Sequence, residues 1–168
     1  MEIKAGCIHD YKTMKAFVRA GTLKARVNSN AFMILYLVLL GYLDWRRGDN
    51  YTFTLIWFGF MLLFNGYMFF VVPRISFRRL GAMKNAKCEY VFSDNGMQIT
   101  KRSEQYNGNS ECAYGMIPKV LETSEYVYIF QTKNTAYVVD KTTLSEEDMA
   151  VLRNVLKEKI SGKYTVRK

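Results

Sequence analysis

The hydrophobic residues of the chain are concentrated in one block, between about residues 31 and 72. The second half of this block, residues 51–72, contains no charged side chain. An α-helix rises about 1.5 Å per residue, so this segment extends roughly 33 Å, enough to cross a hydrocarbon core about 30 Å thick. Pro73 follows directly and is typical of a helix end. The pattern predicts a membrane-spanning helix over residues 51–72.

The first half of the block is shorter and is interpreted together with the second. Residues 31–43 alone have the length of either a membrane span or a buried core helix. Extended to residues 27–45, the segment can span with its polar ends at the lipid headgroups. Because the loop at residues 44–50 permits only a tight connection, we expect a transmembrane hairpin at residues 27–73, with spans at about 27–45 and 51–72. The alternative is a hairpin inside a soluble core, which other segments would have to cover on all sides.

From residue 88 onward the pattern changes to the two-residue alternation of β-strands. Residues 88–92 and 97–101 are separated by a turn in which Asn95 and Gly96 predict left-handed backbone. Four further strands are expected at residues 110–114, 120–123, 126–131 and 136–139, with a turn at 132–135. This part of the chain therefore predicts about six short antiparallel strands.

A helix is expected to close this domain. Ser145 suits the N-cap position, and the three acidic residues after it suit the first turn, where they interact favourably with the helix dipole. Apolar residues then recur at helical spacing as far as Ile160, and Ser161-Gly162 ends the pattern. The sequence thus predicts an α+β membrane protein, in which a two-helix transmembrane hairpin is joined to a small antiparallel β-domain closed by a C-terminal helix, the pattern of a pleckstrin-homology-like domain.

Five segments are expected along the chain. Residues 1–26 form a basic amphipathic segment, in which residues 10–26 are a helix that lies on the membrane or packs on the β-domain. The transmembrane hairpin occupies residues 27–73, and a basic juxtamembrane link occupies 74–87. The cytoplasmic pleckstrin-homology-like domain with its C-terminal helix occupies residues 88–162, and a basic tail occupies 163–168.

The net charge of +9 is confined to the two flanks of the apolar block. Basic residues outnumber acidic ones before the block, and from residue 88 onward the charges balance. Directly after the block five basic residues occur without an acidic neighbour, namely Arg74, Arg78, Arg79, Lys84 and Lys87. Basic loops of membrane proteins stay in the cytoplasm, so we expect a multi-pass protein of the cell inner (cytoplasmic) membrane with both termini cytoplasmic.

The five basic residues after the block are also candidate contacts for lipid headgroups. Each would contribute about 1 kcal/mol near an anionic membrane surface. A nucleic-acid partner is not expected, because the excess charge flanks predicted spans and does not lie on a folded surface or arm. Residues 1–30 contain no continuous apolar run, so no secretory signal is expected there.

Gly59, Asn65 and Gly66 are candidate helix–helix contact residues in the second span. An amide in hydrocarbon usually finds a partner across a helix interface, so Asn65 predicts a structural hydrogen bond or a contact with a second copy of the chain. A functional polar site is the alternative. Gly59 and Gly66 are seven residues apart and are predicted to line one close-packed face.

The sequence contains no pattern typical of catalysis or of a metal or cofactor site. The single histidine, His9, has no neighbour in sequence that suggests a catalytic pair. Cys7, Cys88 and Cys112 are far apart and odd in number, which favours unpaired thiols in a reducing compartment over a disulfide framework or a metal site. We therefore expect a protein that is not an enzyme, with no catalytic residue, no metal and no cofactor.

Three motifs follow the two predicted spans. They are the strand-turn-strand segment Tyr90–Met97, the aromatic strand Tyr126–Phe130, and Lys141 shortly before the acid-capped helix. In this arrangement the chain resembles the YcxB-like family of small bacterial membrane proteins. Where the family pattern has Ile-Pro-Lys, this chain has Val139-Asp140-Lys141, so no role for Lys141 is carried over. The resemblance implies an architecture and brings no biochemical activity with it.

The leading functional hypothesis is a membrane-anchored, non-catalytic binding or regulatory module that presents its β-domain to a protein or lipid partner. The alternative is an immunity protein that protects the cell against a membrane-active toxin or bacteriocin. A membrane enzyme or transporter subunit is disfavoured, because the spans offer only Asn65 as a clearly polar side chain and two spans need oligomerisation to form a transport path.

Overall fold

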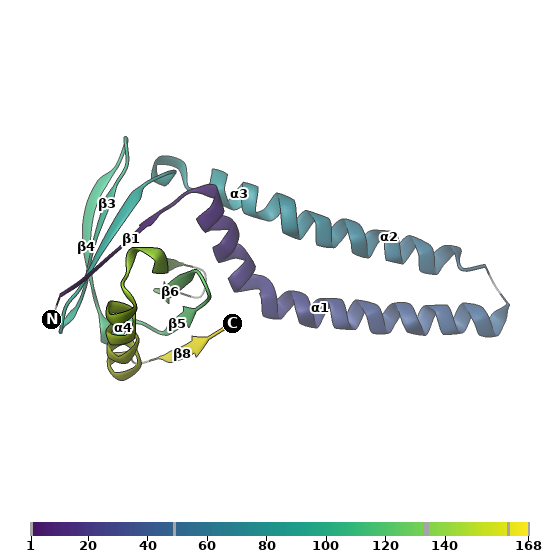
Figure 1. The fold of residues 1–168 in the computed structure, drawn as a ribbon. Helices are drawn as coiled ribbons and strands as arrows, with labels where there is room; N and C mark the ends of the chain where they lie inside the picture. Colours follow the sequence, from purple (N-terminus) through teal and green to yellow (C-terminus); the bar gives the residue numbers. More distant parts are fainter. Residues whose placement is uncertain (1, 49, 133–134, 161, 168) are drawn as a thin grey trace. The chain divides into compact units, whose positions relative to one another are not determined.

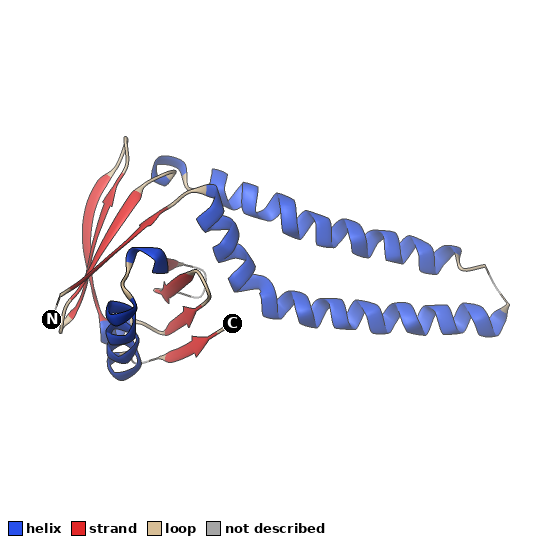
Figure 2. Cartoon of the chain, in the orientation of Figure 1, coloured by secondary structure: helices blue, strands red, loops and turns tan. Residues whose placement is uncertain are grey.

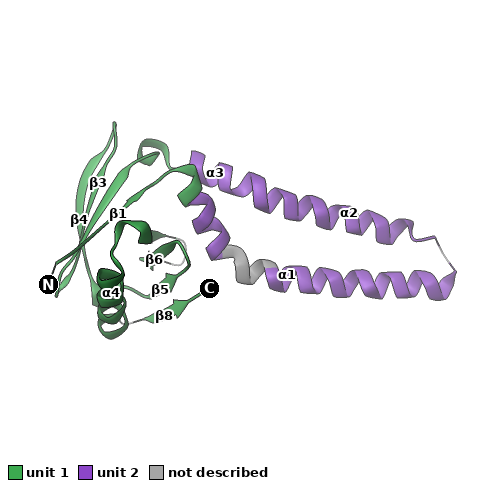
Figure 3. Cartoon of the chain, in the orientation of Figure 1, with its two compact units in different colours: residues 1–13, 80–168 green, residues 14–79 purple. Residues whose placement is uncertain are grey.

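The chain is described by a computed structural model that covers residues 2–48, 50–132, 135–160 and 162–167, with the side chains of residues 22–26 left out. Three predicted features include residues outside these ranges, namely the connections at residues 44–50 and 132–135 and the helix end at Ser161. The chain forms two compact units (Figure 3). We call residues 1–13 and 80–168 the β-rich unit and residues 14–79 the helical unit. The helical segment is therefore inserted near the start of the β-rich sequence.

The helical unit contains most of α1 (Tyr11–Arg47), followed by α2 (Thr52–Gly66), a π-helical turn η1 (Tyr67–Val71) and α3 (Val72–Arg78) (Figure 1). Two segments, Val27–Arg47 and Thr52–Arg78, are long and apolar enough to cross a membrane, and none of the apolar window of either is buried. The prediction of two apolar helices is confirmed. The predicted helix end at Pro73 is wrong, because Pro73 lies in the first turn of α3, where its missing N–H is tolerated.

Side-chain contacts join α1 to α2 and η1. The Thr54 hydroxyl donates a hydrogen bond to the Asp44 carboxylate at 2.7 Å. The rings of Tyr36 and Trp57 meet edge to face, with centroids 5.6 Å apart. The Arg19 guanidinium lies 4.2 Å from the ring centroid of Phe69. These contacts define an antiparallel hairpin of helices within the helical unit.

One sheet of the β-rich unit is a four-stranded antiparallel sheet, here sheet A, in the order β1-β2-β3-β4 (Figure 2). Its strands are β1 (Ile3–Ile8), β2 (Lys87–Phe92), β3 (Gly96–Arg102) and β4 (Asn107–Ala113). Strands β2, β3 and β4 correspond to predicted strands, whereas β1 was not predicted. In β1 the buried residues Ile3, Ala5 and Cys7 alternate with outward residues, but two of the three are small and give a weak pattern.

The second sheet, here sheet B, has the order β7-β6-β5-β8. Its strands are β5 (Lys119–Glu122), β6 (Tyr126–Phe130), β7 (Ala136–Asp140) and β8 (Lys163–Val166). Strand β8 lies within the segment predicted as a basic tail, and it pairs with β5 in parallel, which departs from the all-antiparallel expectation. Short 3-10 segments η2 (Gly81–Met83), η3 (Tyr114–Met116) and η4 (Lys141–Thr143) connect the elements.

The helix α4 (Glu146–Lys159) precedes β8. The Ser145 hydroxyl accepts a hydrogen bond from the Asp148 backbone N–H at 3.0 Å and donates one to the Asp148 carboxylate at 2.7 Å. Ser145 is therefore the N-cap, as the sequence predicted. Met149, Leu152 and Leu156 form the buried face of this helix.

The two sheets and α4 share one apolar core. Its fully buried members include Tyr90, Phe92, Met97 and Ile99 of sheet A, Leu121, Tyr128 and Ile129 of sheet B, and Leu152 and Leu156 of α4. The rings of Tyr90 and Tyr137 meet across the sheets, with centroids 6.2 Å apart. Burial of each large apolar side chain contributes about 2 kcal/mol, which gives the β-rich unit a core of its own. The fold is α+β, with two apolar helices and largely antiparallel sheets.

The turn between β2 and β3 differs from its prediction in backbone geometry. Among the described residues only Asn85, Gly48 and Gly81 have positive φ, so neither Asn95 nor Gly96 is left-handed. A Cβ at Gly96 would lie 2.7 Å from the carbonyl oxygen of Cys112. Glycine is required here because the backbone of β4 approaches closely, and not because of its φ angle.

Candidate functional site

The five basic residues that were predicted to face lipid headgroups are divided between the two units. Arg74, Arg78 and Arg79 belong to the helical unit, and Lys84 and Lys87 belong to the β-rich unit. All five are exposed. Within the described ranges none of them makes an ion pair with an acidic side chain. Their charges are therefore available to an external anion.

In the β-rich unit, the two segments that continue into the helical unit are hydrogen-bonded to each other. The His9 N–H donates to the Ala86 carbonyl at 2.9 Å, and the Asn85 N–H donates to the His9 carbonyl at 3.1 Å. The Ser103 hydroxyl, in the turn between β3 and β4, donates to the Ala82 carbonyl at 2.8 Å. The same end of sheet A thus carries residues 9–13, residues 80–86 and the β3–β4 turn.

Asn65 pairs with Asn30 inside the helical unit. Each side-chain amide donates to the oxygen of the other at 3.2 Å, and Asn65 also donates to the Met61 carbonyl at 2.9 Å. The reciprocal pair satisfies both amides between otherwise apolar helices, because each supplies one donor and one acceptor. Asn30 was not singled out from the sequence, although a second amide in the opposite span is the natural partner for the first.

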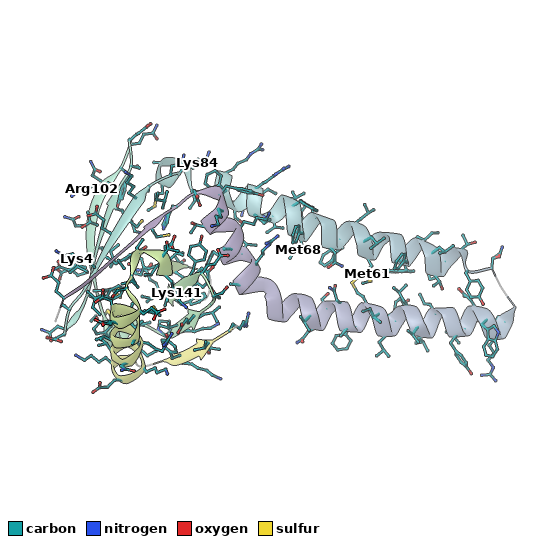
Figure 4. All side chains as sticks on the ribbon, in the orientation of Figure 1. Lys4, Met61, Met68, Lys84, Arg102 and Lys141 are labelled. Carbon is teal, nitrogen blue, oxygen red and sulfur yellow. The ribbon has the colours of Figure 1, made fainter. Side chains whose placement is uncertain are left out.

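Unlike Asn65, the other two predicted contact residues, Gly59 and Gly66, are not packed against the opposite helix. A Cβ built at Gly59 or Gly66 would meet no heavy atom within 4 Å. The predicted close-packed glycine face is therefore absent between the described helices of this chain. Instead, an apolar cavity of about 370 Å³ lies between α1 and α2 and is lined by Phe32, Met33, Tyr36, Leu37, Trp57 and Met61. Figure 4 shows Met61 on α2 with its side chain directed toward α1.

The main polar cluster of the β-rich unit surrounds Glu122, a residue of β5 that is only 2% exposed. Its carboxylate accepts two hydrogen bonds from the Arg153 guanidinium of α4, at 3.0 Å and 2.6 Å. It also accepts one from the Lys141 ammonium at 3.0 Å and one from the Tyr164 hydroxyl of β8 at 2.6 Å. Four separate elements, β5, η4, α4 and β8, therefore meet at one buried carboxylate.

This arrangement shifts the pKa of Glu122. The hydrogen bonds from Arg153 outweigh the opposing effect of burial, and with Tyr164 and Lys141 they lower the pKa of Glu122 from 4.5 to about 2. The same contacts raise the pKa of Arg153, whereas burial first of all raises the pKa of Tyr164. Glu122 is a permanent carboxylate at neutral pH. Because its oxygens are already saturated with donors, it is suited to holding the fold together and not to transferring a proton.

A cavity of about 420 Å³ borders this cluster and shares Lys141 and Arg153 with it. It is lined by Lys141, Leu144, Ser145, Glu146, Met149 and Arg153. Both cations of this lining, Lys141 and Arg153, are already ion-paired with Glu122, and Glu146 adds an acidic side chain. No local pattern in the sequence indicates this cluster, because a single glutamate in a strand does not reveal partners 19, 31 and 42 residues away.

His9, which had no partner in sequence, lies beside Cys88 in the structure. Its Nε2 atom is 3.5 Å from the Cys88 sulfur, and Cys88 is paired in register with Cys7 of β1. Burial lowers the pKa of His9, raises the pKa of Cys88 and raises the pKa of Cys7 to about 12. These shifts favour neutral imidazole and protonated thiols, the opposite of what a thiolate–imidazolium nucleophile requires.

Metal binding finds no support in the described part of the chain. No group of three or more His, Cys, Asp or Glu residues within it is arranged to hold a metal ion. The cavity of about 370 Å³ beside Cys7 and Cys88 is open, and Asp10 and Thr13 line it. The Asp10 carboxylate caps the start of α1, because it accepts a hydrogen bond from the Thr13 N–H at 2.7 Å.

Comparison with known proteins identifies the C-terminal part of the chain. Residues 92–156 match the model of a family described as YcxB-like protein. This region runs from the last residue of β2 into α4 and includes Glu122, Lys141 and Arg153. No curated protein and no solved structure matches the chain. The resemblance seen in the sequence is therefore confirmed over residues 92–156, where this chain is similar to the YcxB-like family.

Proposed function

We propose that this chain is a membrane-anchored, non-catalytic binding module. The helical unit crosses the bilayer as a two-span hairpin, and the β-rich unit is presented to its partners at the cytoplasmic surface. The observation that carries the proposal is the combination of two long apolar helices, whose apolar windows are not buried by protein, with a β-rich unit that has its own core.

The exposure of the apolar helices supports a lipid environment. Phe32 and Leu63 are each 75% exposed, and large apolar side chains are exposed along both helices. A continuous apolar surface of this extent is unfavourable in water, whereas lipid tails solvate it without cost. The alternative of a soluble core hairpin would require other segments to cover these side chains, and the described residues of the chain do not do so.

The charge distribution supports the orientation. The excess of Lys and Arg precedes the first predicted span (residues 27–45) and follows the second (residues 51–72), while the connection between the spans is neutral overall. Basic segments stay on the cytoplasmic side, so both termini and the β-rich unit face the cytoplasm, with the connecting loop outside. This arrangement makes the chain a multi-pass protein of the inner membrane.

The order of elements supports a pleckstrin-homology-like assignment for the β-rich unit. Strands β1 to β4 form one sheet, β5 to β7 belong to a second sheet, and α4 follows. The helical hairpin is then an insertion between the first and second strands, and β8 is an addition after the helix. Such a domain binds partners through its surface and needs no catalytic group. This agrees with the Glu122 carboxylate, whose hydrogen bonds are saturated, and with the buried, protonated thiols beside His9.

Cysteine accessibility in intact cells tests the anchor and its direction. In a Cys112→Ser background, Arg47→Cys places a thiol at the end of α1, and a cysteine appended after the last residue places one at the C-terminus. A membrane-impermeant maleimide added to spheroplasts is expected to label the first thiol and to reach the second only after permeabilisation. A chain that purifies as a monodisperse protein without detergent, or a C-terminal thiol labelled from outside, overturns the proposal.

A further inference from the structure

We propose that one end of sheet A, which includes the β3–β4 turn, docks on the anionic phospholipid headgroups of the bilayer that holds the helical hairpin. This inference rests on the proposed function and adds a contact surface to it. The surface consists of Ile8, Lys84, Lys87, Arg102 and Tyr106, which we call the headgroup-facing end. Sequence reasoning pointed to Lys84 and Lys87, while the other three residues come from the tertiary structure.

Strand register places three of these residues in one row. Ile8 pairs with Lys87 across β1 and β2, and Lys87 pairs with Arg102 across β2 and β3. Directly opposed residues on neighbouring antiparallel strands have side chains on the same face of the sheet. Ile8 is 50% exposed, and both basic side chains are exposed. The row therefore offers an apolar side chain and two cations together at one end of the sheet.

The adjacent β3–β4 turn is fixed by hydrogen bonds and carries an exposed aromatic ring. The Ser103 N–H donates to the Tyr106 carbonyl at 2.8 Å, and the Ser103 hydroxyl donates to the Ala82 carbonyl. Tyr106 is 46% exposed, and its ring lies so close to Gly108 that a Cβ there would be 2.5 Å from the Tyr106 hydroxyl. A tyrosine with an apolar ring and a polar tip suits the boundary between lipid and water.

Chain connectivity brings this end close to the lipid if the hairpin spans. The second candidate span ends at Arg78, and Ala82, which accepts the hydrogen bond from Ser103, follows four residues later. Four residues extend at most about 14 Å, so the β3–β4 turn is held within about that distance of the end of the span. The hydrogen bonds of His9 with Asn85 and Ala86 hold the residues that precede α1 at this same end of sheet A.

The charge of this end is complementary to anionic headgroups. The three cations Lys84, Lys87 and Arg102 outnumber the two acidic side chains of this end, Glu104 in the turn and Asp10, which lines the same cavity as Lys87. None of the three basic residues makes an ion pair within the described ranges. Figure 4 labels Lys84 and Arg102 in this unit, together with Lys4, which lies toward the other end of sheet A. An excess of unpaired cations beside an exposed aromatic ring fits a phosphate-bearing membrane surface.

The β2–β3 turn provides an internal reference at the opposite end of the sheet. Strand β3 has seven residues, so the two turns are separated by about 20 Å along the strand. Asn95 in the first turn and Gln105 in the second are both exposed. A depth measurement at these two positions therefore distinguishes an end that touches the headgroups from an end that faces water.

The test uses the full chain in liposomes of neutral phosphatidylcholine, with or without anionic phosphatidylglycerol. In a Cys112→Ser background, nitroxide labels are placed in separate variants by Leu63→Cys, Gln105→Cys and Asn95→Cys, and their accessibility to oxygen and to a water-soluble nickel chelate is measured. The label at position 63 is expected in hydrocarbon, the label at 105 at headgroup depth, and the label at 95 in water. Nickel accessibility at 105 is expected to be several-fold lower than at 95.

A charge variant tests the role of the cations. With Lys87→Gln and Arg102→Gln combined, the label at 105 is expected to move toward water in anionic liposomes. The matched control combines Lys4→Gln with Lys163→Gln, which removes two exposed cations elsewhere in the unit and is expected to leave the depth unchanged. Water accessibility at 63 overturns the proposed function itself. Hydrocarbon depth at 63 with equal accessibility at 105 and 95, or no response to the charge variant, overturns this inference alone.

Discussion

The Arg153 guanidinium holds the Glu122 carboxylate with two hydrogen bonds, Nε to Oε2 at 3.0 Å and Nη2 to Oε1 at 2.6 Å. The pair joins α4 to β5, and Lys141 and Tyr164 complete the shell around the same carboxylate. Bidentate arginine–carboxylate pairs are both strong and geometrically selective. The relationship therefore fixes how the C-terminal helix and the last strand pack on sheet B.

Replacement of Glu122 by glutamine is expected to destabilise the β-rich unit by about 3 kcal/mol, because it removes the charge and leaves two cations without their counter-ion. Urea unfolding of the full chain in mild detergent, followed by circular dichroism, measures the loss. The matched control is Glu125→Gln, which removes an exposed carboxylate 3.9 Å from Lys12. This control is expected to change the free energy of unfolding by less than about 1 kcal/mol. Equal effects of the two variants would contradict the structural role of the cluster.

The stability of the β-rich unit is expected to decrease in acid through Glu122. Its pKa is about 2 in the folded chain against an ordinary value of 4.5, so the folded state binds the proton more weakly than the unfolded state. The contribution is fully present above about pH 5 and is lost as the pH falls through 4.5 toward 2, with a total of about 3 kcal/mol. Unfolding free energies measured from pH 7 to pH 3 check this. Glu122→Gln is expected to flatten the acid limb, and an unchanged slope in this variant would assign the acid sensitivity to other groups.

Loss of one member of the Asn30–Asn65 pair is expected to weaken the helical hairpin. Asn65→Ala leaves the Asn30 amide without its partner between apolar helices, at a cost of about 1 kcal/mol. A double-mutant cycle with Asn30→Ala, measured by unfolding in sodium dodecyl sulfate, is expected to give a coupling energy of about 0.6 kcal/mol. Gly59→Ala is the control, since a Cβ there meets nothing within 4 Å and is expected to be neutral. Strict additivity of the two asparagine variants would argue against the pair.

Substitution of Gly162 by alanine is expected to displace β8. A Cβ at this position would clash with the Pro118 carbonyl oxygen, which is backbone and cannot rotate away. Overpacking of this kind costs about 1–3 kcal/mol, and a shifted β8 also withdraws the Tyr164 hydroxyl from Glu122. Gly115→Ala is the matched control, because a Cβ there meets nothing within 4 Å. Amide hydrogen exchange of residues 163–166 measures the displacement of β8. Protection in the Gly162→Ala variant equal to that of the parent chain would refute the prediction.

Thiol reactivity is expected to rank Cys112 first. Burial raises the pKa of all three thiols, but Cys7 and Cys88 are buried in sheet A, whereas Cys112 lies on the edge strand β4 and is partly exposed. Timed alkylation with N-ethylmaleimide and mass spectrometry should give one fast adduct in the folded chain and three after unfolding in urea. Rapid modification of Cys7 or Cys88 in the folded chain would show that β1 opens from β2.

The sequence alone determined the features that depend on local pattern. The apolar runs fixed the two helices, since length and the absence of charge suffice to define them. Alternation from residue 88 indicated the strands from β2 to β7, and Ser145 with its acidic neighbours marked the start of α4. Each of these signals lies within a few residues of the element that it predicts.

Only the tertiary structure decided the features that join distant residues. Strand β1 precedes the helical insertion by a few residues but pairs with β2, about 80 positions later in the chain. Glu122 meets Arg153 and Tyr164, and Asn65 meets Asn30, through packing that no short window of sequence contains. Arg102 lies opposite Lys87 only because of the register between β2 and β3. Local propensity specifies elements, whereas pairing between elements depends on burial and hydrogen bonding summed over the whole fold, and the polar partners of this chain arise from that second step.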